Sequence, residues 1–175
     1  MANTCTFDLI IYSKDKETGE QICKIMNHDV PGLYMANVYD SVSCSDPKYL
    51  EEYGCWRTEL HGESRWCTSH AFYGDEDTTE PDKEGDICTS LKALSKEMNF
   101  GCMLIDDEPG CVYHYQFARD NLGNIIMEKN LAEPIPEKIQ KMLDDGDDDA
   151  WDTYEEYIES QVEYIPPYKL FRRVD

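Results

Sequence analysis

In the first part of the chain, the spacing of apolar residues follows the two-residue period of strands in some segments and the longer period of helices in others. β-branched and aromatic residues predict a strand from Thr4 to Ser13, and a cluster of apolar residues at helical spacing predicts a helix from Lys16 to Asn27. A second strand is predicted from Leu33 to Val42. Asp46 is expected to cap a short helix from Pro47 to Tyr53. The chain therefore opens with a strand, a helix and a strand.

The middle of the chain has the pattern of a hairpin followed by a loop and a helix. Two strand-like segments, Cys55 to Leu60 and Arg65 to Phe72, flank a predicted turn at His61 to Ser64. The segment from Gly74 to Gly85 has no apolar residue and predicts an exposed acidic loop. Asp86 is expected to cap a helix that runs to Asn99.

Three further strands complete the predicted sheet. They run from Phe100 to Ile105, from Cys111 to Ala118 and from Asn124 to Glu128, and the last two are joined by a turn that ends at Gly123. This order of elements predicts an α+β fold with an antiparallel or mixed sheet and helices on one face. A ferredoxin-like split β-α-β arrangement is the expected topology.

The composition changes after Asn130, which divides the chain into a predicted α+β core, residues 1–130, and an acidic helical extension, residues 131–175. A short helix from Glu137 to Leu143 and a helix from Ala150 to Tyr164 flank the nearly pure charge of residues 144–149. The second helix has an apolar and aromatic stripe. We expect this stripe to dock on the sheet, with exposure as anchors for a partner as the alternative.

Charge is the outstanding feature of the composition. Sixteen Lys and Arg against 37 Asp and Glu give a formal net charge of −21. Such a field repels nucleic acid and anionic membranes and attracts basic protein surfaces, although an acidic surface kept only for solubility is the alternative. Residues 144–163 hold ten acidic residues and no Lys or Arg. As one helix they would carry about one charge per 3 Å, against one per about 1.7 Å of duplex DNA.

This comparison selects the candidate partner-binding residues. The main set lies in the extension and consists of Asp144, Asp145, Asp147, Asp148, Asp149, Asp152, Glu155, Glu156 and Glu159. A second acidic patch is expected in the loop, at Asp75, Glu76, Asp77 and Glu80.

The eight cysteines are expected to be reduced. Their spacing is wide and irregular, the N-terminus carries no apolar leader, and no run approaches the roughly 18 apolar residues of a membrane span, so a cytoplasmic location is expected. Cysteines of such chains are usually buried thiols. They are Cys5, Cys23, Cys44, Cys55, Cys67, Cys88, Cys102 and Cys111.

Patterns for metals, cofactors and catalysis are weak. No two cysteines are nearer than nine residues, and the C-x-x-H pairs at Cys67 and Cys111 would point to opposite faces of a strand. A calcium loop beginning at Asp144 would have Asp149 where glycine is required. Phosphate-binding, dinucleotide-binding and hydrolase motifs are missing from the sequence. We therefore expect no cofactor and no enzyme, with a Cys/His enzyme as a third hypothesis.

One resemblance adds to this interpretation. The opening Met1-Ala2-Asn3-Thr4-Cys5, the Cys55-Trp56 and Arg65-Trp66 pairs, and the later order of helix, strand, acidic turn at Asp106 to Glu108 and hairpin resemble the YubB-type ferredoxin-like proteins of phages and plasmids. The resemblance covers residues 1–130. It implies a ferredoxin-like fold and an origin in a mobile element, and it transfers no catalytic residues.

Together these features predict a phage or mobile-element inhibitor that acts in the host cytoplasm. In functional style it resembles an acidic anti-CRISPR protein, a DNA mimic that occupies the basic channel of a host nuclease such as a CRISPR effector. Direct binding of nucleic acid or membrane is not expected. The alternative is a protein-binding or regulatory module without inhibitory activity, whose acidity is incidental.

Overall fold

A computed structural model describes residues 4–36, 38–39, 41–65, 68, 72–73, 81, 85–108 and 113–172. Seven strands form the main sheet: β1 (Thr4–Ser13), β3 (Ser43–Cys44), β4 (Lys48–Leu50), β5 (Cys55–Arg65), β7 (Phe100–Asp107), β8 (His114–Arg119) and β9 (Ile125–Asn130). A second, parallel pair consists of β2 (Leu33–Met35) and β6 (Ile87–Thr89). The helices are α1 (Thr18–Met26), α3 (Leu91–Glu97), α4 (Glu137–Asp145), α5 (Ala150–Gln161) and α6 (Pro167–Leu170).

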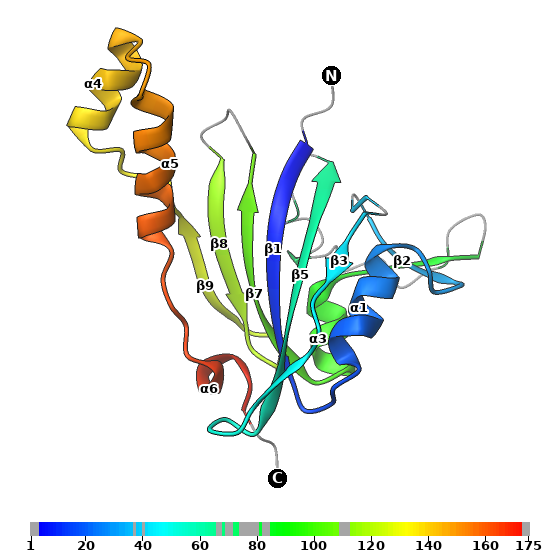
Figure 1. Ribbon diagram of the computed structural model, residues 1–175. Helices are drawn as coiled ribbons and strands as arrows, with labels where there is room; N and C mark the ends of the chain where they lie inside the picture. Colours follow the sequence, from blue (N-terminus) through cyan, green and yellow to red (C-terminus); the bar gives the residue numbers. More distant parts are fainter. Residues whose placement is uncertain are drawn as a thin grey trace.

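The main sheet is antiparallel throughout and has the order β3-β5-β1-β7-β8-β9, with β4 also paired to β5. β1 lies between β5 and β7, which are themselves joined through α3, so the topology is compatible with a split β-α-β, ferredoxin-like arrangement. Figure 1 shows α1 and α3 together on one face of this sheet. The predicted α+β class is confirmed.

The face covered by α1 and α3 holds the main core. Alternation along β1 places Phe7, Leu9 and Ile11 on this face, where they are buried against Ile22 of α1 and Leu91 of α3. Each such side chain contributes about 1.5–3 kcal/mol when it is fully buried. The period-2 pattern of β1 therefore both defines the strand and selects its buried face.

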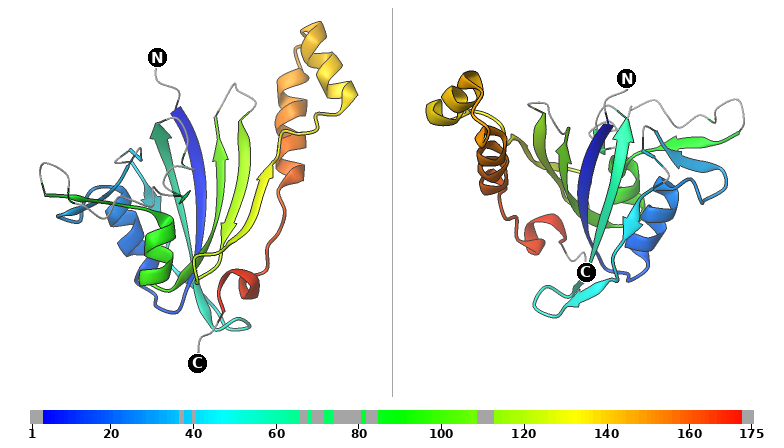
Figure 2. Two further views of the ribbon diagram at one scale, coloured as in Figure 1. Left: turned by 180° about the vertical axis from the view of Figure 1, so that it is seen from behind. Right: turned by 45° about the horizontal axis from the view of Figure 1, so that its top comes forward.

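The C-terminal segment covers part of the opposite face. Tyr12 of β1 and Ala118 of β8 are buried there with Ile165, Leu170 and Phe171. Figure 2 shows α5, the segment after it and α6 running along this side of the sheet, away from α1 and α3.

Gly101 allows the C-terminal segment to approach the sheet closely. A Cβ on Gly101 of β7 would lie 2.0 Å from the backbone oxygen of Leu170. A larger residue at this position would therefore push α6 away from the sheet.

The predicted turn at His61 to Ser64 is wrong. β5 is continuous and pairs with all ten residues of β1, from Thr4 opposite Arg65 to Ser13 opposite Trp56. Gly62 serves packing rather than a turn, because a Cβ there would come within 2.7 Å of the Phe7 ring. Most of the predicted second arm, Arg65 to Phe72, lies outside the described residues.

Two predicted helix positions are also wrong. Lys48–Leu50 is a strand paired with β5 instead of a helix, and Tyr49 packs on Trp56 with ring centroids 5.1 Å apart. The helix predicted from Asp86 begins only at Leu91, because Ile87–Thr89 pairs with β2 and Ser90 supplies the cap. The partner of Ile87–Thr89 is distant in the sequence, whereas Lys48–Leu50 pairs with the strand that directly follows it, and in both cases strand pairing outweighs the local helical signal.

The strand predicted from Leu33 to Val42 is shorter, since β2 ends at Met35. Among the described helices, none has the length and apolar character needed to cross a bilayer.

Candidate functional site

The predicted acidic extension folds into a hairpin of two helices, α4 and α5, which we call the acidic arm (residues 137–161). Gly146 ends α4 in the left-handed conformation, with φ 68°, and Asp147 N donates a hydrogen bond to Met142 O at 3.0 Å. Glycine adopts this conformation without steric cost, so it reverses the chain here. The arm projects beyond the ends of β8 and β9 (Figure 1). Residues 144–163 are thus not the single helix assumed in the comparison with DNA.

The apolar stripe of α5 docks the arm, as expected. Tyr154 and Ile158 are buried in a cluster with Leu131, Ala132 and Ile139. The Tyr154 ring also packs edge-on against His114, with centroids 5.6 Å apart. Because this side of α5 is occupied, the opposite side is left to solvent.

The structure brings the nine predicted acidic residues of the extension together on this arm. All nine are exposed: Asp144, Asp145, Asp147, Asp148, Asp149, Asp152, Glu155, Glu156 and Glu159. Five of them gather at the tip, where α4 ends and α5 begins. Within the described part of the chain none of the nine forms an ion pair, whereas Glu20 of α1 pairs with Lys24 at 2.7 Å.

Hydrogen bonds shape the tip without neutralising it. Gln140 Nε2 donates to Asp144 Oδ1 at 2.9 Å, and the Asp149 backbone N–H donates to Asp147 Oδ1 at 3.0 Å. Both donors are uncharged groups, so neither hydrogen bond places a positive charge beside these carboxylates. The second predicted patch, Asp75, Glu76, Asp77 and Glu80, lies outside the described residues.

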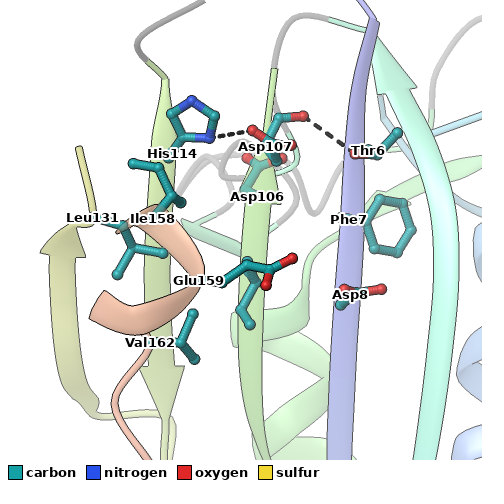
Figure 3. A pocket seen from close by; sticks show the side chains of 11 residues that line it. Thr6, Phe7, Asp8, Asp106, Asp107, His114, Leu131, Ile158, Glu159 and Val162 are labelled. Atoms are coloured by element: carbon teal, nitrogen blue, oxygen red, sulfur yellow. Dashed lines mark hydrogen bonds and ion pairs between the residues drawn. The ribbon is translucent and has the colours of Figure 1, made fainter. Parts of the chain in front are cut away.

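A cavity of about 240 Å³ lies where α5 meets the sheet, at the base of the acidic arm (Figure 3). Its apolar lining comes from the sheet, from the segment after β9 and from α5: Phe7, Ile105, Leu131, Ile158 and Val162. Its polar lining consists of Thr6, Asp8, Asp106, Asp107, His114 and Glu159. We call this cavity the arm-base pocket.

Histidines hold two carboxylates of the pocket region in place. His114 Nδ1 contacts Asp107 Oδ1, and His61 Nδ1 contacts Asp8 Oδ1. The His114 side chain is only 8% exposed, whereas Asp107 is 41% exposed, so the histidine forms part of the wall and the carboxylate reaches the opening. Figure 3 shows Glu159 extending from α5 across β7 toward Asp8.

Of these pocket residues, only Glu159 is among the predicted partner-binding residues. Asp8 was overlooked because it is one acidic residue in a predicted strand. Asp107 was assigned to the acidic turn at Asp106 to Glu108, and this is wrong, because β7 continues to Asp107 beside β1. A usable signal existed in β1, where polar Thr6 and Asp8 alternate with buried Cys5, Phe7 and Leu9. That alternation marks the face on which the pocket lies.

The electrostatic environment near the arm is negative. Burial raises the pKa of the Tyr154 hydroxyl, and the charges of Asp107, Tyr157 and Glu133 raise it further. The phenol therefore stays protonated over a wide pH range.

The described cysteines give no support to a Cys/His enzyme. Cys23, Cys55 and Cys102 are buried free thiols, as predicted, whereas the free thiol of Cys44 is exposed and that of Cys88 is half-buried; none of these five lines the pocket. Burial raises the pKa of Cys23 to about 11 and that of Cys102 to about 12, which disfavours the nucleophilic thiolate. Cys67 and Cys111 lie outside the described residues.

Within the described ranges, no group of three or more His, Cys, Asp or Glu side chains could hold a metal ion. The pocket carboxylates therefore do not converge on one point.

Comparisons with protein-family models, with curated proteins and with solved structures found no match to this chain. The resemblance to YubB-type proteins stays a prediction.

Proposed function

We propose that this protein is an inhibitor that binds a basic surface of a nucleic-acid-binding protein through its acidic arm. The proposed binding surface is the nucleic-acid channel of a host defence nuclease, such as a CRISPR effector. The chain itself would be encoded by a phage or another mobile element. Occupation of that channel by carboxylates excludes the phosphates that it normally holds.

The observation that carries the proposal is the unneutralised charge at the tip of the arm. From Met142 to Tyr168 the chain contains no Lys or Arg, and the acidic residues at the tip are exposed without ion pairs in the described structure. Ordinary surface helices mix signs to gain pairs between residues four apart. The repulsion within a surface of one sign is relieved when a positive partner approaches it.

Two of the charges at the tip are placed against local stability. Asp144 and Asp145 occupy the last turn of α4, where the negative end of the helix dipole disfavours further negative charge. Asp149 and Asp152 lie near the start of α5, where the dipole favours them. A sequence selected only for solubility has no need to crowd carboxylates at the unfavourable end of a helix. The arrangement is better explained by binding.

The dimensions of the arm suit a groove that holds nucleic acid. The twelve residues of α5 span about 18 Å, and they carry Asp152, Glu155, Glu156 and Glu159 on exposed positions. This is about one charge per 4–5 Å, with the five aspartates of the tip added at one end. The charge is sparser than that of duplex DNA, so the arm resembles a short stretch of single strand more than a duplex.

Site-specific crosslinking identifies the partner. A photo-crosslinking amino acid replaces Asp148 at the tip, and a matched protein carries it at exposed Glu97 of α3. We expect proteins captured only from position 148 to bind nucleic acid, and the purified partner to release a labelled nucleic acid as the inhibitor is added. A captured protein that holds its nucleic acid at saturating inhibitor would contradict the proposal.

A further inference from the structure

The arm-base pocket combines an apolar wall with several carboxylates. Ile105, Leu131 and Val162 supply hydrocarbon contact, while Asp8, Asp107 and Glu159 supply negative charge from β1, β7 and α5. An anion is repelled by this lining. A neutral apolar ligand would remove the carboxylates from water without compensation, which is costly.

The ligand is therefore a cation, and its size is limited. Pockets for drug-sized ligands usually measure about 300–1,000 Å³, whereas this cavity measures about 240 Å³. A metal ion is too small, because the carboxylates of the described residues do not converge on one point. An organic cation with an apolar stem fits both limits.

We propose that the arm-base pocket binds one arginine side chain of the partner. The methylene groups of the arginine pack along Ile105, Leu131 and Val162, and its guanidinium reaches Asp107 and Glu159 at the opening. The planar guanidinium has five N–H donors in a fixed fork, so it satisfies carboxylates that approach from different directions better than a lysine ammonium does.

The histidine contacts prepare the pocket for this ligand. His114 lies against Asp107 and His61 lies against Asp8, so both carboxylates are oriented before the ligand arrives. The Asp107 side chain as a whole is 41% exposed, although its Oδ1 atom, which contacts His114, is buried. Preorganised acceptors lower the entropic cost of binding.

This inference deepens the proposed function, because the pocket lies at the base of the same arm that faces the basic partner. It names arginine as the residue that such a partner inserts. It also gives the interface an anchor beyond surface charge, since a side chain held in a pocket contributes more than exposed ion pairs do.

Nuclear magnetic resonance on the full chain tests the pocket without any partner. The probe is arginine blocked at both ends, with blocked citrulline as the neutral isostere and blocked lysine as the alternative cation. We expect arginine to shift the methyl resonances of Ile105, Ile158 and Val162, and citrulline to leave them unchanged. Equal shifts with citrulline, or stronger binding of lysine, would overturn the assignment to a guanidinium.

Substitutions test whether arginine binds in the arm-base pocket. Glu159→Gln should weaken arginine binding roughly fivefold, the effect of about 1 kcal/mol from one partly exposed charged contact, and Asp8→Asn should weaken it less. Glu63→Gln removes the same charge from an exposed position outside the pocket and should have little effect. Equal weakening by Glu159→Gln and Glu63→Gln would show general attraction to acidic surface and overturn the pocket. These binding measurements contain neither nucleic acid nor the partner. Their outcome therefore does not depend on whether the proposed inhibition is correct.

Discussion

Gln116 and Glu163 are joined by two reciprocal hydrogen bonds across 47 residues of sequence. Gln116 Nε2 donates to the Glu163 backbone oxygen at 2.7 Å, and the Glu163 backbone N–H donates to Gln116 Oε1 at 2.9 Å. The side chain of Gln116 thus pairs with the backbone as a neighbouring strand would. It fixes the point at which the chain leaves α5 and returns along the sheet, and so it sets the position of the acidic arm.

Replacing Gln116 with Ala should release this attachment. Gln116 is fully buried, and the Glu163 N–H and carbonyl would lose their partner, so the free energy of unfolding should fall by about 1–3 kcal/mol. Hydrogen exchange at the Glu163 amide should become faster. Gln21→Ala, at an exposed position of α1, is the control and should cost less than about 0.5 kcal/mol. Unchanged exchange at Glu163 would show that other contacts hold this segment.

Two substitutions of Tyr154 distinguish the contribution of its buried ring to stability from that of its hydroxyl group. Its side chain is 1% exposed, and its hydroxyl has no hydrogen-bond partner within the described structure. Tyr154→Phe should therefore leave the free energy of unfolding unchanged or raise it by about 1 kcal/mol, because a buried hydroxyl without a partner is removed. Tyr154→Ala should lower it by about 3–5 kcal/mol through loss of the buried ring. Urea denaturation followed by circular dichroism measures both, and equal losses would contradict the docking of α5.

Alkaline pH should destabilise the protein through its buried thiols. Burial raises the pKa of Cys102 from 9.0 to about 12 and that of Cys23 to about 11. The folded chain therefore holds protons that the unfolded chain loses. This contribution to stability is complete below about pH 9 and is lost as the pH rises through 12.

Denaturation midpoints measured from about pH 8 to pH 11 test this prediction. Cys102→Ala should show a smaller decline than the wild type, while Cys88→Ala, at a partly exposed site, should decline like the wild type. Identical slopes in all three proteins would rule out a contribution from Cys102.

Local pattern predicted the elements whose burial follows one regular period. The bounds of β1 agree with the prediction to the residue, since every second side chain from Cys5 to Ile11 is buried. The α5 helix was predicted from its stripe, although it ends at Gln161 rather than Tyr164. The exposure of the acidic residues of the arm was predicted because an unpaired carboxylate is costly to bury.

Local pattern failed where packing or pairing with another strand decides the conformation. Gly62 has the composition of a turn, but its missing side chain makes room for Phe7 of the neighbouring strand. Lys48–Leu50 forms a strand instead of the predicted helix because it pairs with β5. The arm-base pocket combines β1, β7, β8 and α5, and no single segment carries its signature.

The acidic arm carries the proposed function, and competition with nucleic acid for the crosslinked partner tests this function most directly. One variant changes Asp147, Asp148, Asp149 and Asp152 to Lys. Its control changes Asp15, Asp29, Glu51 and Glu97 to Lys, all exposed and outside the arm. Four reversals of two charges each take both from −21 to −13, so the net charges are equal.

Fluorescence anisotropy of a labelled nucleic acid on the partner measures displacement by each protein, with circular dichroism to confirm folding. We predict that the arm variant loses displacement by roughly 100-fold or more, while the control retains it within a few fold, and that wild-type displacement weakens steeply with salt. A folded arm variant that displaces nucleic acid as well as the control does would contradict the proposed function.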